Sequence, residues 1–184
     1  MSLIKKLSFF GICFAFVVIA LGAWTRLVDA GLGCPDWPGC YGFVVFPTTE
    51  AEILLAEQRY PQFPYEIDKA IPEVVHRYFA AALGFIAILL VAFAFKYNLP
   101  KKIKAITSFL LFFICCQGLF GYLTVSLKLL PIIVTGHLFG GFITLSLFFY
   151  LFLSTTDGIR NHQIGHLKIL GGIALIALLI QIFL

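Results

Sequence analysis

Two histidines in this sequence belong to long apolar segments: His76 comes just before one apolar run, and His137 lies inside another. Ionisable side chains in such segments are costly and usually mark function. Each histidine lies near the beginning of its segment, and at about 1.5 Å of rise per residue the two rings fall within a turn or two of equal depth. We expect the two helices to descend side by side and to aim both imidazoles at one shared centre.

Small residues lie next to both histidines, at helical spacings that place them beside the rings: Ala80, Gly84, Gly136, Gly140 and Gly141. A porphyrin needs small residues next to its axial ligands, and neutral imidazole is a common axial ligand of haem iron. The pair His76 and His137 is therefore predicted to ligate haem iron. The alternative is that the small residues only allow close helix packing, while each histidine bonds a neighbouring carbonyl.

Glu73 precedes His76 by three residues, so the two side chains share a face if the helix begins near Pro72. A proline or an acid in the first turn of a helix is favourable by itself, and this explanation needs no function. The functional alternative is a carboxylate that moves protons or stabilises positive charge on a substrate carbon. Arg77 is predicted either to pair with a haem propionate or to anchor the helix at the interface.

Five cysteines occur, and their positions divide them into two groups. Cys34 and Cys40 flank a short polar stretch that contains two prolines, and this stretch could be closed by a disulfide. The competing interpretation is a thiol pair used for redox exchange. The other cysteines lie in apolar segments and are predicted to act as small hydrophobic residues: Cys13, Cys115 and Cys116.

The composition defines the class of protein that must position these residues. Of 184 residues, 61% are hydrophobic and 12% are charged, with a mean hydropathy of +1.01. Soluble domains are about 45–50% apolar and about 25% charged. The formal net charge is +4, but the sequence has no basic cluster on a polar scaffold of the kind that binds nucleic acid. These values exclude an ordinary globular protein of the cytosol, a disordered tail and a nucleic-acid-binding protein.

The chain contains stretches that are free of charged residues and are long enough, or nearly so, to cross the roughly 30 Å hydrocarbon core. They are residues 7–24, 78–95, 105–127, 129–156 and 169–184. We predict an all-α polytopic membrane protein, with a four-helix transmembrane bundle, a fifth helix and membrane lipid around it. Lys5 and Lys6 before the first stretch are also compatible with a signal peptide, but no small-residue cleavage site closes it. We expect a haem-binding domain at 1–156, and an inner loop with the fifth helix at 157–184.

Lysines and arginines in the short loops predict the orientation. With the N-terminus in the cytoplasm, eight fall inside: Lys5, Lys6, Lys96, Lys101, Lys102, Lys104, Arg160 and Lys168. Five then fall outside: Arg26, Arg59, Lys69, Arg77 and Lys128. We therefore expect a multi-pass protein of the cell (inner) membrane with a long outer loop at about residues 25–72. Within that loop, a short helix is expected around residues 50–59, with Thr48 or Thr49 near its start.

Four motifs together resemble the bacterial heme A synthases, in the same order and on the same helices. They are Thr25–Cys40 in the outer loop, Glu73-Val74-Val75-His76-Arg77, Gln117–Gly121 with Thr124-Val125, and Thr135-Gly136-His137-Leu138. The resemblance implies oxidation of the C8 methyl group of heme O to the formyl group of heme A, for insertion into cytochrome oxidase. It further implies that His76 and His137 are axial ligands, that Glu73 is an essential carboxylate, and that Cys34 and Cys40 are the paired loop cysteines.

Many members of that family have eight helices in two halves, with a second histidine pair in the latter half, whereas this sequence ends at Leu184 inside its fifth apolar stretch. We expect a missing second half or a homo-oligomer, with heme O as substrate and heme B as an alternative haem. Heme O synthase and cytochrome oxidase assembly proteins are the expected partners. The alternative functions are an electron-transfer membrane cytochrome, an inactive half that binds heme O, and, ranked last, a quinone-linked thiol oxidase.

Overall fold

The computed structural model describes residues 3–156, and its regular secondary structure over that range is helical, apart from one isolated bridge between Cys40 and Phe43 in a loop. Its helices are α1 (Leu3–Leu27), α2 (Glu50–Arg59), α3 (Ile67–Lys96), α4 (Lys101–Ser126) and α5 (Pro131–Ser154). All except α2 are long and apolar enough to cross a membrane. The prediction of an all-α polytopic membrane protein is confirmed, while the fifth predicted span lies outside the described residues.

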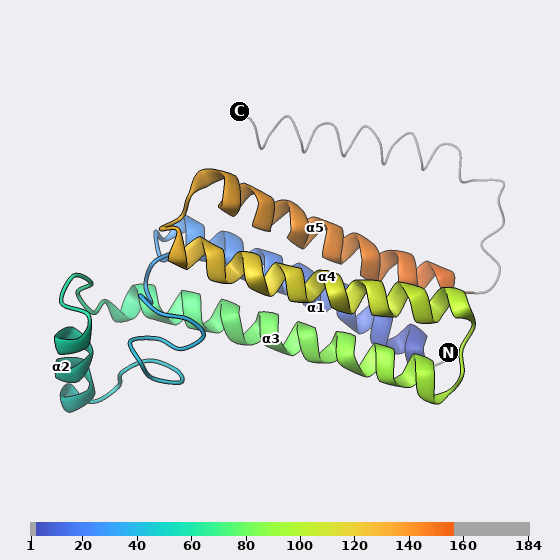
Figure 1. Ribbon diagram of the computed structural model, residues 1–184, viewed down its shortest axis with the longest axis horizontal. Helices are drawn as coiled ribbons and strands as arrows, with labels where there is room; N and C mark the ends of the chain where they lie inside the picture. The colour runs from blue at the N-terminus through green and yellow to red at the C-terminus, as the bar shows by residue number, and fades with distance from the viewer. Residues whose placement is uncertain (1–2, 157–184) are drawn as a thin grey trace.

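The four long helices form a closed ring in which each helix packs against two others. Helix α1 contacts α3 and α5, and α4 contacts the same two helices. Figure 1 shows these helices lengthwise beside one another, with α2 and the long loop gathered at one end. Helices α3 and α5, which carry the two histidines, therefore lie diagonally across the bundle. The expectation that they run side by side is wrong, because short turns make sequential helices the neighbours.

The interior of the bundle is largely apolar, and three buried hydroxyls in it are satisfied locally. Leu90 and Ala94 of α3, Leu110 of α4 and Phe148 of α5 are fully buried. The buried hydroxyls of Ser8, Thr107 and Thr144 each donate to a carbonyl one turn earlier on the same helix. No hydrogen bond between helices is thus needed to accommodate these three side chains.

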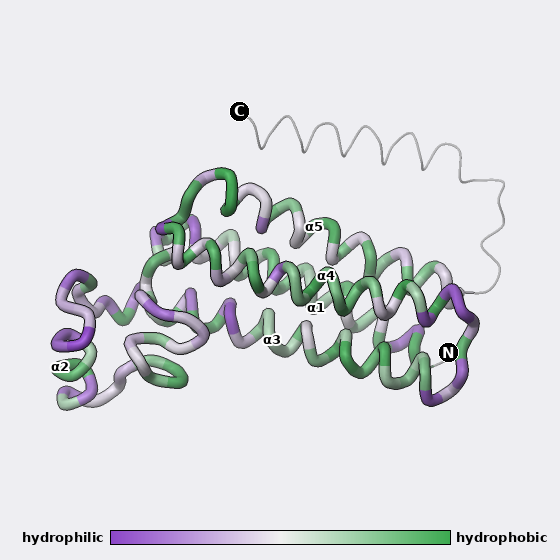
Figure 2. The backbone as a smooth tube through the Cα atoms, in the orientation of Figure 1, coloured by the Kyte–Doolittle hydropathy of each residue, from purple (hydrophilic) through white to green (hydrophobic). Residues whose placement is uncertain are grey.

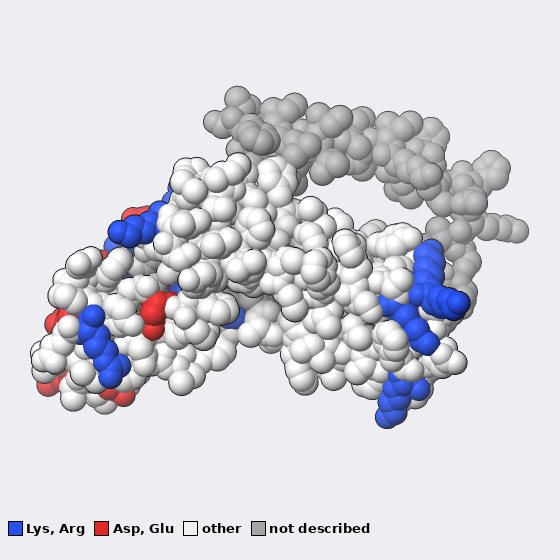
Figure 3. Space-filling view, in the orientation of Figure 1, with Lys and Arg blue, Asp and Glu red and all other residues white. Residues whose placement is uncertain are grey.

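The outward faces are also apolar, as a lipid environment requires. Large side chains such as Phe16, Phe85 and Phe112 are 60–65% exposed, and Figure 2 shows hydrophobic residues along most of each long helix. Hydrophilic residues collect around α2 and in the turn between α3 and α4. Among the charged side chains visible in Figure 3, those at the end that holds this turn are all lysine or arginine, and those at the opposite end include both acidic and basic residues.

The short helix expected in the loop is confirmed, with Thr49 as its N-cap. The Thr49 hydroxyl accepts from the Glu52 amide, and the Glu52 carboxylate accepts from the amides of Thr48 and Thr49, which forms a capping box. These hydrogen bonds lower the pKa of Glu52 to about 2. The stabilisation from this carboxylate is present above its ordinary pKa of 4.5 and is lost as the pH falls through about 2.

Helix α3 begins at Ile67, one and a half turns before the position expected from Pro72. The amides of Lys69 and Ala70 donate to the Glu66 carbonyl, which starts the helix upstream of the proline. Pro72 lies inside the helix and lacks only the N–H that would reach the carbonyl of Asp68. The proline is therefore tolerated at the cost of one backbone hydrogen bond, and Glu73 and His76 still share a face.

Gly11 of α1 lies directly against Phe148 of α5. A Cβ atom at this position would overlap the ring of Phe148, which is fully buried. Gly118 on α4 offers the opposite case, because nothing lies within 4 Å of a Cβ atom there.

We expect Gly11→Ala to destabilise the bundle by about 1–3 kcal/mol through overpacking. The matched variant Gly118→Ala should leave stability unchanged or raise it by up to about 1 kcal/mol, since alanine favours the helix. Thermal unfolding in detergent, followed by circular dichroism, measures both. Equal effects of the two variants would contradict the close contact at Gly11.

Candidate functional site

His76 from α3 and His137 from α5 meet in the centre of the bundle. Their ring centroids are 6.4 Å apart and the ring planes are perpendicular. The two helices reach this centre from opposite corners of the ring of helices, so neither backbone blocks the space between the side chains. The structure therefore brings together the two histidines singled out in the sequence.

Helix α1 orients the His76 ring, a contribution that the sequence analysis missed. Nδ1 of His76 lies 3.1 Å from the carbonyl oxygen of Val18. Because a carbonyl only accepts, this contact places the proton on Nδ1 and leaves Nε2 with a free lone pair. A Cβ atom at Gly22 would lie 3.0 Å from Cε1 of His76, so glycine at this position gives the ring its room.

His137 carries a polar atom with no partner. Its Nδ1 is buried and makes no hydrogen bond within residues 3–156. An unsatisfied buried nitrogen costs about 1–3 kcal/mol. Gly121 of α4 lies beside the same ring, where a Cβ atom would be 3.6 Å from Cε1. The imidazole is thus held by packing in an environment that does not by itself satisfy it.

The glycines of α5 are in contact with side chains of neighbouring helices. Gly136 faces Phe120, Gly140 faces Gln117, and Gly141 faces Ile19. This is the close packing given as the alternative explanation for these small residues. The atoms over the glycines belong to side chains rather than to backbone, so any room that a flat ligand needs depends on rotation of those side chains.

The spacing of the two histidines fits axial ligation of one iron. A metal–imidazole bond is about 2 Å and the ring centre lies roughly 1 Å beyond the nitrogen, so two axial ligands hold their centroids about 6 Å apart. Within the described residues, no group of three or more His, Cys, Asp or Glu side chains could hold a metal ion. Two histidines suffice only where the cofactor supplies the remaining ligands, as a porphyrin does.

Glu73 lies one helical turn from His76, towards the end of the bundle that carries the long loop. The residue is 5% exposed. Its Oε2 accepts a 2.9 Å hydrogen bond from the amide of Cys34, and its Oε1 pairs with Nη2 of Arg77. Both oxygens therefore have partners, as a buried carboxylate requires.

The other terminal nitrogen of Arg77 binds the loop between the two cysteines. Nη1 donates to the carbonyl oxygens of Asp36, at 2.9 Å, and of Gly39, with Pro38 further away at 3.4 Å. Cys34 and Cys40 form a disulfide that closes this loop. The pairing of Arg77 with a haem propionate stays a prediction, while its terminal nitrogens have their acceptors within the protein.

Further contacts fix the loop on both sides. The Asp36 carboxylate accepts from the amides of Tyr41 and Gly42, and the ring of Trp37 meets Tyr122 of α4 edge-on at 5.9 Å. Tyr41 is buried, its hydroxyl donates to the carbonyl of Pro64, and burial raises its pKa to about 12. The loop thus contacts both α3 and α4 at the end of the bundle nearer to the histidine pair.

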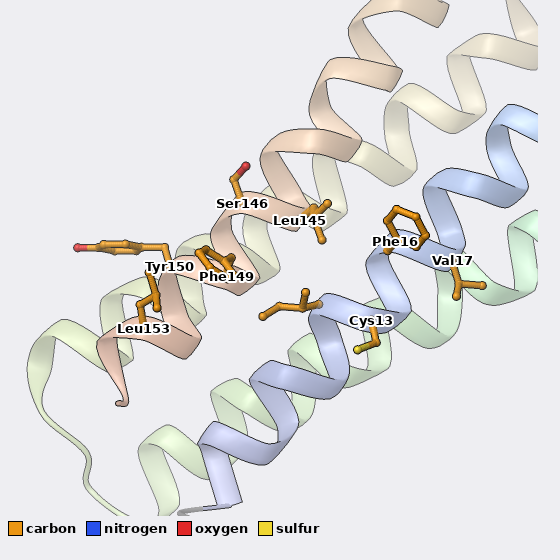
Figure 4. Close-up of a pocket in the computed structure, with 9 residues that line it drawn as sticks. Cys13, Phe16, Val17, Leu145, Ser146, Phe149, Tyr150 and Leu153 are labelled. Atoms are coloured by element: carbon orange, nitrogen blue, oxygen red, sulfur yellow. The ribbon is translucent and has the colours of Figure 1, made fainter. Parts of the chain in front are cut away.

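A separate groove lies between α1 and α5, nearer the end of the bundle where α1 begins. It measures about 740 Å³ and is lined mainly by apolar side chains, including Phe16, Leu145 and Phe149 (Figure 4). Leu145 is eight residues beyond His137 on α5, about 12 Å along a helix. Neither His76 nor His137 is among the residues that line the groove.

The fold and the site define a multi-pass membrane protein with a histidine pair in its bundle and a disulfide-closed loop over it. The sequence model of the cytochrome oxidase assembly protein family matches residues 5–184. A heme A synthase of Shewanella oneidensis is 44% identical over 142 residues, which are 77% of this chain and 42% of that relative. The chain belongs to the cytochrome oxidase assembly protein family, which confirms the resemblance found in the motifs.

Gly22 gives a test of how α1 positions His76. We expect Gly22→Val to push the ring off the Val18 carbonyl. On the prediction that His76 ligates haem iron, this variant should weaken retention of haem about 10- to 100-fold, the usual effect of disturbing a residue that orients a metal ligand. Gly118→Val introduces the same side chain into a helix at an open position and should retain haem. Haem absorbance per mole of purified protein measures both, and equal retention would contradict the role of Gly22.

Proposed function

We propose that this chain acts in heme A biosynthesis, in the oxidation of the C8 methyl group of heme O to a formyl group. The central observation is the meeting of His76 and His137 at a ring separation of 6.4 Å, with the buried Glu73 one turn away. The similarity to a protein named heme A synthase supports the same substrate. Because the chain spans 42% of that relative, the catalytic activity of this chain is itself proposed here.

His76 and His137 would hold the substrate through its iron, His76 by Nε2, since its Nδ1 contacts the Val18 carbonyl. The bound heme O supplies the iron and the methyl group that is oxidised. The Val18 carbonyl keeps His76 in the tautomer that can ligate. Between the histidines and the lysine-rich end, the interior of the bundle is apolar and excludes water. The polar groups at the loop end are therefore those available for proton transfer.

Glu73 is the group we assign to that transfer. Conversion of a methyl to a formyl group with oxygen from water (R–CH3 + H2O → R–CHO + 4 H+ + 4 e−) passes its electrons to an acceptor outside the described residues. A carboxylate near the reacting carbon can accept a proton or stabilise positive charge on it. Its two oxygens are held by the Cys34 amide and by Arg77. The side chain therefore has a fixed position beside the histidine pair.

The proposal includes a location and an orientation. We place the protein in the inner membrane with the lysine-rich end, which includes Lys5, Lys6 and the turn from α3 to α4, in the cytoplasm. The disulfide then lies on the oxidising side, where such bonds persist. We further propose residues 1–156 as the haem-binding unit, which works as a homo-oligomer or with a second half. Heme B as a second haem, heme O synthase and cytochrome oxidase assembly proteins remain proposed partners.

Identification of the bound haem is the first test of this function. The chain is expressed in membranes supplied with heme O, and the extracted haem is separated by chromatography and identified by mass. Heme A or its hydroxylated precursor is expected. Heme O or heme B alone would instead indicate an electron-transfer cytochrome or a binding unit without activity. A chain that retains no haem would contradict the histidine site itself.

Removal of either histidine should abolish haem binding. We expect His76→Ala and His137→Ala each to lower the haem content of the purified protein at least tenfold, because a single axial ligand remains. His162→Ala serves as a control, since this residue belongs to the polar segment after residue 156. Haem content is measured per mole of folded protein, and unchanged content in either variant would remove that residue from the site.

Substitution of Glu73 should separate binding from chemistry. We expect Glu73→Gln to retain haem at the level of the parent chain, because the amide preserves the size of the side chain. Formation of oxidised haem should fall about 100-fold or more, since general acid–base groups contribute about 10²–10⁴-fold. Haem content and product identity are measured on the same preparation. Product formation at the parent rate would remove Glu73 from the mechanism.

A further inference from the structure

We infer that Arg77 is a positioning residue, which holds Glu73 in place by tying it to the disulfide-closed loop at residues 34–40. This inference rests on the proposed role of Glu73. It assigns the terminal nitrogens of Arg77 to the protein rather than to an anionic group of a ligand. The evidence is the set of acceptors around the guanidinium, the rigidity of the loop that supplies them, and the two-sided hold on Glu73.

The guanidinium of Arg77 joins two elements that are distant in the sequence. Nη2 pairs with Glu73 on the same helix, and Nη1 donates to the carbonyls of Asp36 and Gly39 in the loop. The side chain of Arg77 is 13% exposed and that of Glu73 is 7% exposed. The planar fork of arginine points two separate nitrogens at acceptors on opposite sides, whereas lysine would have to reach all of them from one nitrogen.

The loop presents these acceptors independently of Arg77. The disulfide between Cys34 and Cys40 closes it, and the Asp36 carboxylate binds the amides of Tyr41 and Gly42. Gly39 lies so near the Phe43 carbonyl that a Cβ atom would overlap it. The carbonyls that receive Nη1 are therefore fixed points, and Arg77 is anchored to them.

The same loop holds Glu73 by its other oxygen. The amide of Cys34 donates directly to Oε2, while Oε1 is held through Arg77. The backbone of the loop lies against α3 at Gly33, where a Cβ atom would overlap the carbonyl oxygen of Lys69. Glu73 is thus attached to one rigid loop at two points. Loss of Arg77 would remove the partner of Oε1, and the carboxylate would be held only by backbone amides of the loop at Gly33 and Cys34.

The first experiment measures the tie between Arg77 and the loop without any reaction of haem. The disulfide is reduced with a water-soluble phosphine, and alkylation of Cys34 and Cys40 is followed by mass spectrometry. We expect Arg77→Met and Glu73→Gln to accelerate reduction several-fold over the parent chain. The matched control is Lys69→Met on the same helix, whose lysine makes only an exposed ion pair with Glu66. Reduction of Arg77→Met at the rate of this control would overturn the inference.

The second experiment separates positioning from binding. In Arg77→Met we expect the turnover of heme O to fall about 10- to 100-fold, the effect of misplacing a reacting group. Haem content and KM should stay at the parent values. Arg77→Lys keeps the charge but not the fork, and it should recover only part of the turnover. A fall in haem content that parallels the fall in turnover would show that Arg77 binds the ligand, which overturns the inference.

Failure of the two proposals would look different. If the parent chain forms no oxidised haem, the proposed reaction fails, but the reduction rates still decide whether Arg77 ties Glu73 to the loop. If the parent chain is active and Arg77→Met matches Lys69→Met in both experiments, the inference fails and the reaction stands.

Discussion

A carboxylate buried near the end of a membrane bundle must be paired, and the pairing of Glu73 organises the polar end of this protein. An unpaired ion there would cost several kcal/mol. The chain meets this constraint with an arginine one turn away on α3 and with backbone groups from the loop after α1. The loop must therefore return to α3, and the disulfide gives it the closed shape that presents an amide and two carbonyls at the correct places.

The histidine pair is positioned in a different way, by the arrangement of the helices. Because α3 and α5 stand diagonally, His76 and His137 can point at each other without bringing their backbones together. Helix α1 fixes one ring through the Val18 carbonyl and Gly22, whereas the other ring keeps a buried nitrogen without a partner within residues 3–156. Such asymmetry suits a site that is completed by a ligand, since natural interiors rarely leave a polar atom unsatisfied.

The sequence predicted the elements better than the contacts between them. Hydropathy located the four described spans, and a threonine before a helix-forming stretch predicted α2, because both signals are local. The common depth of His76 and His137 followed from helical rise alone. The diagonal placement did not, because it depends on which helices pack together. The contacts of Arg77 with the carbonyls of Asp36 and Gly39 were also beyond prediction, since backbone acceptors carry no residue signature.

The pairing of Glu73 and the placement of His76 both depend on the same segment of α3. Glu73, His76 and Arg77 occupy little more than one turn, so the segment that supplies the proposed iron ligand also supplies the ion pair that anchors the loop. A shift of α3 along its axis would move the ligand and break the loop contacts together. The Trp37 contact with Tyr122 ties the same loop to α4, next to Gly121 beside His137. The loop therefore links the surroundings of both histidines, and the geometry of the site depends on how this extramembrane segment folds as much as on the bundle beneath it.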